Sequence, residues 1–267
     1  MDRNSSIVLR SGNAIPVVGL GTWLLTRDTE ATIAYALELG YPLIDTSSDY
    51  GTQPGIGRAI AKSAVGRDDI YLSTKVEETD DAYGRAQRNL VELGLDYVDL
   101  LLIHRPPFFG AGERLWDGLL RARDDGMARD IGVSNYSTYL IERLIESSGE
   151  APAVNQIEWS PFGHSDEMAA YCGERQIVIQ SYSPLTRATR LRDERLVSTA
   201  GRYGKTPAQI LIRWNIQTGC VPIPKANQRR HLEENLDVFD FELSETDIAF
   251  LDGLNETYSS LGSLPYI

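Results

Sequence analysis

The stretch LIDTSSDYG, Leu43 to Gly51, joins a short apolar run to a loop that carries an acid and a phenol. The apolar residues are typical of a buried strand that ends at Asp45, and the Thr-Ser-Ser-Asp segment after it is typical of a turn. Tyr50 then follows Asp45 after four intervening residues. The pattern fits an ordinary capped loop, but it also fits half of a proton-transfer site at one edge of a sheet.

Similar apolar runs recur along the chain and alternate with amphipathic helical patterns. Strands are predicted at residues 17–20, 42–44, 70–73, 98–103, 130–133, 153–157, 177–180 and 221–223. Helices are predicted at residues 29–39, 81–93, 114–124, 137–146, 165–173, 207–216 and 229–235, with an added helix at 244–253. Alternating strands and helices favour a parallel sheet, and eight strands are the number at which such a sheet closes into a barrel.

We therefore expect an α/β protein with a (β/α)8 TIM barrel, preceded by a short N-terminal β-hairpin. The hairpin is predicted from apolar residues 7–9 and 15–18 on either side of the turn residues Ser11, Gly12 and Asn13. The 267 residues fit one barrel of roughly 250 residues, and no linker or change in composition divides them. A single domain over residues 1–267 is the simplest interpretation.

Composition excludes several kinds of partner. The formal net charge of −12 disfavours binding to nucleic acids and to anionic membranes. The opening segment does not resemble a secretory signal, and no run approaches the 18 apolar residues of a membrane span. Cys172 and Cys220 are far apart and lack CxxC spacing, so we expect no disulfide framework, no metal site and a cytoplasmic location.

Polar residues follow the predicted strands. In a parallel barrel these positions meet at one mouth, where the chemistry of such folds is located. Each residue alone has an ordinary explanation, such as a loop cap for Asp45, a solvated side chain for Lys75 or a hydrogen-bonded core residue for His104. Their convergence on one mouth favours a site. The residues at these strand ends are Asp45, Lys75, His104, Ser134, Asn135, Gln156, Tyr182 and Lys225.

At this point the sequence resembles the aldo-keto reductases, in particular bacterial members similar to 2,5-diketo-gluconate reductases. The resemblance covers nearly the whole chain and rests on ordered motifs: GLGTW (19–23), LIDTSSDYG (43–51), LSTKV (72–76), LDYVDLLLIHRP (95–106), IGVSNY (131–136), PAVNQIEWSP (152–161), QSYSPL (180–185), IPKAN (223–227) and EEN (233–235). It implies a TIM barrel that binds a nicotinamide cofactor without a Rossmann unit, and the absence of GxGxxG agrees with this.

The residue types suggest how a carbonyl could be reduced. A carbonyl that accepts hydride develops negative charge on its oxygen, so a pre-placed proton donor lowers the barrier. An ammonium near a phenol favours the phenolate form, and a carboxylate paired with that ammonium partly neutralises the charge of the ammonium. The resemblance implies these roles: Tyr50 as general acid, Lys75 and Asp45 as its tuning pair, and His104 as the residue that orients the substrate.

The resemblance also implies a cofactor site. Ser134, Asn135 and Gln156 would bind the carboxamide, Tyr182 would stack on the nicotinamide, and Lys225 would hold the 2′-phosphate of NADPH. Further cofactor-binding residues are expected at Thr22, Ser183, Leu185, Arg230, Glu234 and Asn235.

Two departures from the family pattern matter. Ala226 and His231 stand where relatives usually carry serine and arginine, so NADPH is expected and NADH remains open as a second cofactor.

Trp23 and Arg105 are expected at the substrate pocket. A guanidinium at Arg105 would favour acidic or hydroxylated substrates, unless it forms a surface ion pair.

The expected function is NADP(H)-dependent reduction of small aldehydes and ketones to alcohols by a monomer whose partner is a small-molecule carbonyl substrate. One alternative is an aldolase-type lyase that forms a Schiff base on Lys75. Another is a cofactor-binding regulatory barrel with little turnover. The physiological substrate and the direction of the reaction stay open.

Overall fold

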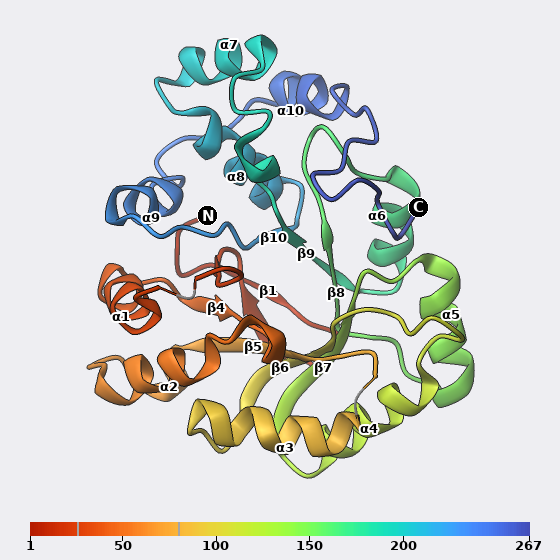
Figure 1. Cartoon of the computed structure of the whole chain (residues 1–267). Coiled ribbons are helices and arrows are strands. Elements are labelled where there is room, and N and C mark those ends of the chain that lie inside the picture. Colours follow the sequence, from red (N-terminus) through yellow and green to blue (C-terminus); the bar gives the residue numbers. More distant parts are fainter. Residues whose placement is uncertain (26, 80) are drawn as a thin grey trace.

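The main sheet consists of eight parallel strands in sequential spatial order. They are β3 (Leu20–Gly21), β4 (Leu43–Asp45), β5 (Tyr71–Val76), β6 (Val98–Ile103), β7 (Ala128–Ser134), β8 (Val154–Glu158), β9 (Val178–Tyr182) and β10 (Val221–Pro222). The computed structural model describes residues 1–25, 27–79 and 81–267. Figure 1 shows the strands at the centre and the helices around them, as expected for a (β/α)8 barrel.

The two edges of the sheet are joined by backbone hydrogen bonds. The Gly19 N–H donates to the Pro222 carbonyl at 3.0 Å, and the Gly21 N–H donates to the Pro224 carbonyl at 3.3 Å. A Cβ at Gly21 would lie 2.7 Å from the Ile223 carbonyl oxygen, so this close approach requires glycine. The predicted barrel is therefore confirmed.

Strand β6 is almost entirely apolar because both of its faces are buried. In β6, Leu100 and Leu102 belong to the cluster inside the barrel, whereas Leu101 and Ile103 pack in the layer between the strands and the helices. This is why β6 reads as a nearly continuous apolar run, interrupted only by Asp99.

The predicted hairpin is also confirmed. Strands β1 (Ser6–Val8) and β2 (Ala14–Pro16) pair antiparallel, with Ile7 opposite Ile15. Leu9 and Ile15 share the interior cluster with Leu43 and Tyr71, the first residues of β4 and β5. The hairpin thus packs against the N-terminal end of the barrel and leaves the opposite end for the site.

Ten α-helices lie among the described residues, and two of them were not predicted. They are α1 (Thr29–Leu39), α2 (Gln53–Lys62), α3 (Ala82–Leu93), α4 (Glu113–Asp124), α5 (Thr138–Ser148), α6 (Asp166–Glu174), α7 (Glu194–Tyr203), α8 (Pro207–Gln217), α9 (Arg229–Leu236) and α10 (Glu245–Asp252). Within the part of the chain that the structure describes, no helix is long and apolar enough to cross a membrane.

Local features of the sequence explain why helices α2 and α7 were not predicted. Helix α2 contains glycines that disfavour helix, but a Cβ at Gly57 would lie 2.0 Å from the Leu93 carbonyl oxygen, so tight packing on the end of α3 explains that glycine. Helix α7 buries Leu196, Thr199 and Ala200, of which only Leu196 is a large apolar residue.

The first barrel strand was predicted at 17–20 and lies at β3 (Leu20–Gly21) instead. Val17 and Val18 are buried against Ile212 and Ile216 of α8 and are not part of the strand. Their apolar character reflects packing against a helix.

Candidate active site

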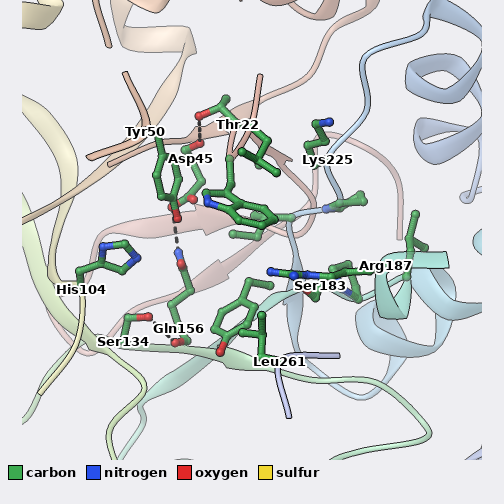
Figure 2. Close-up of a pocket in the computed structure, with 18 of the residues that line it drawn as sticks. Thr22, Asp45, Tyr50, His104, Ser134, Gln156, Ser183, Arg187, Lys225 and Leu261 are labelled. Atoms are coloured by element: carbon green, nitrogen blue, oxygen red, sulfur yellow. Dashed lines mark hydrogen bonds between the residues drawn. The ribbon is translucent and has the colours of Figure 1, made fainter. Parts of the chain in front are cut away.

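A cavity of about 710 Å³ opens at the C-terminal ends of the barrel strands. Figure 2 shows Tyr50, His104, Ser134 and Gln156 on one side of it and Ser183, Arg187 and Lys225 on the other. Thirteen of the predicted site residues line this cavity: Thr22, Trp23, Asp45, Tyr50, His104, Arg105, Ser134, Asn135, Gln156, Tyr182, Ser183, Leu185 and Lys225.

Lys75 lies beneath the cavity and does not line it. It is fully buried in β5, and its ammonium donates to Asp45 Oδ1 at 2.9 Å, to Asp45 Oδ2 at 2.8 Å and to the Thr46 carbonyl at 2.7 Å. Asp45 accepts a further hydrogen bond from Ser73 Oγ at 2.7 Å. The ammonium and the carboxylate therefore neutralise each other within the barrel.

Tyr50 lies above this pair, on the 3-10 turn that follows β4. The Lys75 ammonium is 5.1 Å from the centroid of the Tyr50 ring, and the His104 ring packs edge-on against it at 5.7 Å. The local sequence explains the position, because the turn at Ser48–Tyr50 follows directly on the strand that carries Asp45. An acid, an ammonium and a phenol are thus brought together as the sequence predicted.

The environment of Tyr50 keeps its hydroxyl protonated. Burial raises the pKa of Tyr50 well above its usual value, and the carboxylates of Asp45, Asp49 and Glu77 raise it further, whereas Arg105 opposes them. From the sequence we expected the Lys75 ammonium to favour phenolate and the Asp45 carboxylate to reduce that effect by pairing with it. Lys75 is paired with Asp45, and the pKa of Tyr50 is raised.

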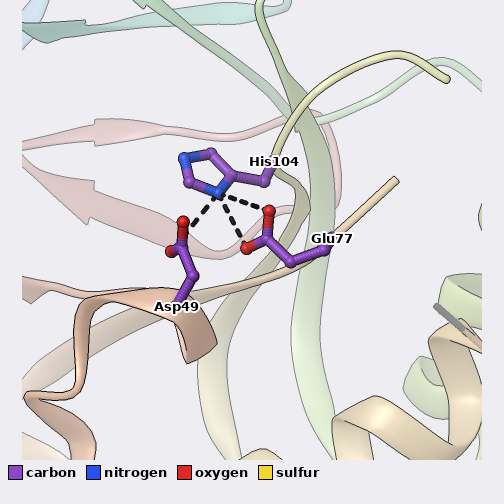
Figure 3. Close-up of side chains that lie close together, drawn as sticks. All are labelled: Asp49, Glu77 and His104. Atoms are coloured by element: carbon purple, nitrogen blue, oxygen red, sulfur yellow. Dashed lines mark hydrogen bonds and ion pairs between the residues drawn. The ribbon is translucent and has the colours of Figure 1, made fainter. Parts of the chain in front are cut away.

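His104 lies directly after β6 and points one ring edge toward carboxylates. Its Nδ1 is 2.8 Å from Glu77 Oε1, 3.0 Å from Glu77 Oε2 and 3.6 Å from Asp49 Oδ1 (Figure 3). A histidine and two acids at this spacing could also ligate a cation. Arg105 pairs with both acids and already supplies positive charge, so we interpret the group as an ion-pair cluster.

The environment of Arg105 differs from that of a free guanidinium. Its guanidinium lies 3.3 Å from Glu77, 3.6 Å from Asp49 and 3.7 Å from Glu78. Three carboxylates therefore surround one cation at this wall of the cavity. The sequence left open an ion pair or recognition of acidic substrates, and these contacts favour the ion pair.

The predicted carboxamide-binding residues form one hydrogen-bond network. Gln156 uses its amide group to donate to Asp45 Oδ1 at 2.8 Å and to Gln180 Oε1 at 2.7 Å. Asn135 donates to Ser134 Oγ at 3.0 Å, and its Oδ1 accepts from the Tyr182 hydroxyl at 2.7 Å. Because the Gln156 amide protons are engaged below the cavity, its Oε1 is the atom suited to accept a hydrogen bond from a ligand.

The remaining predicted cofactor residues divide into two groups. Thr22 lines the cavity, and its hydroxyl donates to the Asp45 carbonyl at 2.9 Å. Lys225 also lines the cavity, and in the described parts of the chain it has no acidic partner within ion-pair distance. The other group lies on α9, outside the residues that line the cavity, and consists of Arg230, Glu234 and Asn235.

The structure adds cavity residues that the sequence did not indicate. Arg187 follows β9, and its guanidinium lies 4.4 Å from the centroid of the Trp23 ring, so the two side chains form one wall. Leu24 and Leu261 contribute apolar surface near the mouth. Arg187 stands in a segment of positive φ angles, and Leu261 is far along the chain from any strand end, so no strand-end rule could identify them.

Leu261 is held near the cavity by contacts to Glu158, the last residue of β8. The buried Glu158 carboxylate accepts from Ser259 Oγ at 2.6 Å, from the Ser260 N–H at 2.8 Å and from the Ser260 hydroxyl. The Tyr266 hydroxyl donates to the Glu158 carbonyl at 2.6 Å. The C-terminal segment is thereby fastened to the barrel beside the cavity.

Comparison with known proteins places these features in one family. Residues 17–256 match the model of the aldo/keto reductase family. An aldo-keto reductase of Mycobacterium tuberculosis H37Rv is 42% identical, and the match covers 94% of this chain and 91% of that protein.

Solved structures of aldo-keto reductases also superpose closely on this chain. An aldo/keto reductase from Brucella melitensis superposes with a TM-score of 0.89 at 37% identity, covering 94% of this chain and 99% of that chain. A Bombyx mori aldo-keto reductase in complex with NADP superposes with a TM-score of 0.91 at 32% identity, covering 97% of this chain and 95% of that chain. With its barrel and its strand-end cavity, this chain belongs to the aldo/keto reductase family.

Proposed function

We propose that this chain reduces small aldehydes and ketones to alcohols with NADPH, and that Tyr50 supplies the proton. The observation that carries the proposal is the position of the Tyr50 phenol at the cavity, above the buried Lys75–Asp45 ion pair, where burial and nearby carboxylates raise the pKa of Tyr50. A donor of this kind can protonate the oxygen of a carbonyl as hydride arrives at its carbon.

The cavity residues fit a nicotinamide nucleotide. Gln156 Oε1 can accept from a carboxamide N–H, the Tyr182 ring offers a face for stacking, and Lys225 offers a cation without an acidic partner among the described residues. Bound NADPH would supply the hydride. The side chains of this chain would then orient the carbonyl, through His104, and deliver the proton from Tyr50 Oη.

The first test is a titration with NADPH and with NADH that follows tryptophan fluorescence, because Trp23 lines the cavity. Turnover of a generic aromatic aldehyde is measured in parallel. Tight NADPH binding together with NADPH consumption supports the proposal. Absence of binding by either nucleotide would leave the family membership intact and refute the proposed cofactor.

Lys225→Ala is expected to weaken NADPH binding by about tenfold and to change NADH binding by less than about twofold. The reason is that a charge-assisted contact to a 2′-phosphate is lost, and only NADPH carries that group. Fluorescence titrations of both nucleotides measure the effect. Lys62→Ala, which removes a surface lysine paired with Glu30, serves as the control. Equal weakening of both nucleotides would contradict the assigned role.

A double variant, Ser259→Ala with Ser260→Ala, tests the role of the C-terminal segment. We expect KM for small aldehydes to rise about threefold or more, because hydroxyl hydrogen bonds to the Glu158 carboxylate are lost and Leu261 leaves the cavity. Steady-state kinetics and the midpoint of thermal unfolding are measured. Ser147→Ala on α5 is the control, and an unchanged KM would show that the segment does not shape the pocket.

The two alternatives are less well supported. A Schiff base requires a neutral amine that the substrate can reach, but the Lys75 nitrogen makes three hydrogen bonds beneath the cavity floor and is fully buried. A regulatory barrel with little turnover is distinguished by the turnover assay alone.

A further inference from the structure

Gln180, in the middle of β9, is a polar residue next to the apolar interior of the barrel. It is fully buried, and Val178 and Val221 beside it belong to the interior cluster. Its amide nitrogen Nε2 is buried and has no hydrogen-bond partner among the described residues. A buried donor without a partner destabilises a fold, so a role other than stability is expected for this side chain.

The other end of the amide, Oε1, makes a specific contact. Gln156 lies opposite Gln180 in the register of β8 and β9, and its Nε2 donates to Gln180 Oε1 at 2.7 Å. The same nitrogen donates to Asp45 Oδ1 at 2.8 Å, a bond that Figure 2 shows as a dashed line. An amide nitrogen carries two protons, so Asp45 and Gln180 together use both.

These two bonds determine which atom of the Gln156 amide is left for a ligand. Both oxygens of Asp45 accept from the Lys75 ammonium, so the carboxylate is an acceptor and the nitrogen of Gln156 must face it. One bond alone would let the amide turn about that bond. The second bond, to Gln180, fixes the plane of the amide. Gln156 lines the cavity, and its Oε1 accepts no hydrogen bond among those described.

We propose that Gln180 is a positioning residue for the nicotinamide cofactor: it holds the second amide proton of Gln156, so that Gln156 Oε1 is aimed at the carboxamide N–H group. The proposal rests on the proposed function and extends it to a residue that does not line the cavity. Orienting the acceptor before the ligand arrives lowers the cost of binding. The chain should therefore distinguish a carboxamide from a ring substituent that has no N–H group.

A purely structural role for Gln180 predicts a different response to mutation. Gln180→Met keeps an unbranched side chain, removes the hydrogen bond to Gln156 and also removes the buried nitrogen that has no partner. These effects on stability oppose each other, so we expect the midpoint of thermal unfolding to shift by less than about 4 °C. If Gln180 served stability alone, the midpoint would fall and ligand preference would not change.

The ligand preference is measured by fluorescence titration with NADP⁺ and with its 3-acetylpyridine analogue, in which a methyl group replaces the amide nitrogen. We expect the wild-type protein to bind NADP⁺ about fivefold or more tightly than the analogue, as for one hydrogen bond. In Gln180→Met we expect this ratio to fall to about twofold or less. Gln180→Leu, which has a shorter side chain and also lacks the acceptor, should give the same result if the acceptor matters and packing does not.

Gln209→Met is the matched control. Gln209 is a buried glutamine on α8 that donates to the Asp237 carbonyl at 2.6 Å, and it does not line the cavity. Losing that bond should lower the midpoint of thermal unfolding. The ratio of affinities for the two nucleotides should match the wild-type ratio.

Several results would overturn the proposal. They are equal binding of the two nucleotides by the wild-type protein, an unchanged ratio in both Gln180 variants, a lowered ratio in Gln209→Met, and failure of both Gln180 variants to fold, which would make the residue structural. If the wild-type protein binds neither nucleotide, the proposed cofactor is wrong and Gln180 has no such role. Wild-type binding of NADP⁺ with an unchanged ratio in the variants would refute the role of Gln180 alone.

Discussion

Tyr50→Phe is expected to lower kcat for aldehyde reduction by a factor of about 10² to 10⁴, the usual contribution of a general acid. The substitution removes one hydroxyl and keeps the ring that packs against His104. Since the hydroxyl is not among the groups proposed to hold NADPH, nucleotide affinity should stay within about twofold. Steady-state NADPH oxidation and fluorescence titration of the same preparation measure the two effects.

A matched control separates the proton donor from general effects of losing a tyrosine hydroxyl. Tyr171 lies on α6, outside the residues that line the cavity, and its hydroxyl donates to Glu142 at 2.9 Å. Tyr171→Phe should retain wild-type kcat. If Tyr50→Phe keeps more than about half of the wild-type kcat, the proton comes from another group and the proposed mechanism is wrong.

The positions of the polar strand ends could be predicted because a parallel barrel imposes them. Once alternating strands and helices indicate eight parallel strands, residues that follow each apolar run must meet at one mouth. This reasoning located His104 after β6 and Ser134 at the end of β7, and both line the cavity. It required the order of the elements and the C-terminal end of each apolar run.

The same reasoning could not predict what the side chains bind to. Asp49 and Glu77 read as ordinary loop acids, but the fold places both beside His104 Nδ1. Pairing with Asp45 likewise changes the effect of Lys75 on Tyr50, although both residues were identified. The distances between side chains at different strand ends decide these ion pairs and pKa shifts. The spacing of residues along the sequence does not give those distances.

Residues from remote segments were missed for a related reason. Leu261 reaches the cavity because Ser259 and Ser260 bind Glu158. These residues are far apart in the sequence, so no local sequence pattern predicts the contact. Arg187 reaches it through a loop with positive φ at Thr186, Arg187 and Ala188, a conformation that non-glycine residues rarely adopt and that composition does not indicate.

Lys75→Met is expected to lower the free energy of unfolding by about 3–5 kcal/mol, the usual cost of breaking a buried ion pair by removing one partner. Methionine fills much of the volume of the lysine stem but leaves the buried Asp45 carboxylate without its cation. Ser73 Oγ at 2.7 Å and Gln156 Nε2 at 2.8 Å remain as neutral donors to Asp45. They lessen the loss but do not supply charge. Urea unfolding followed by circular dichroism measures the change.

The double variant Asp45→Asn with Lys75→Met distinguishes charge imbalance from loss of packing. Removing both charges abolishes the uncompensated carboxylate, so the double variant should be less destabilised than the sum of the two single variants, by about 2 kcal/mol or more. Asp99→Asn with Lys75→Met is the control, because Asp99 pairs with Arg67 and Arg129 and has no described contact with Lys75. If the losses in unfolding free energy of the two single variants simply add in the double variant, the charges of Asp45 and Lys75 are not coupled. The proposal that they neutralise each other beneath Tyr50 would then be wrong.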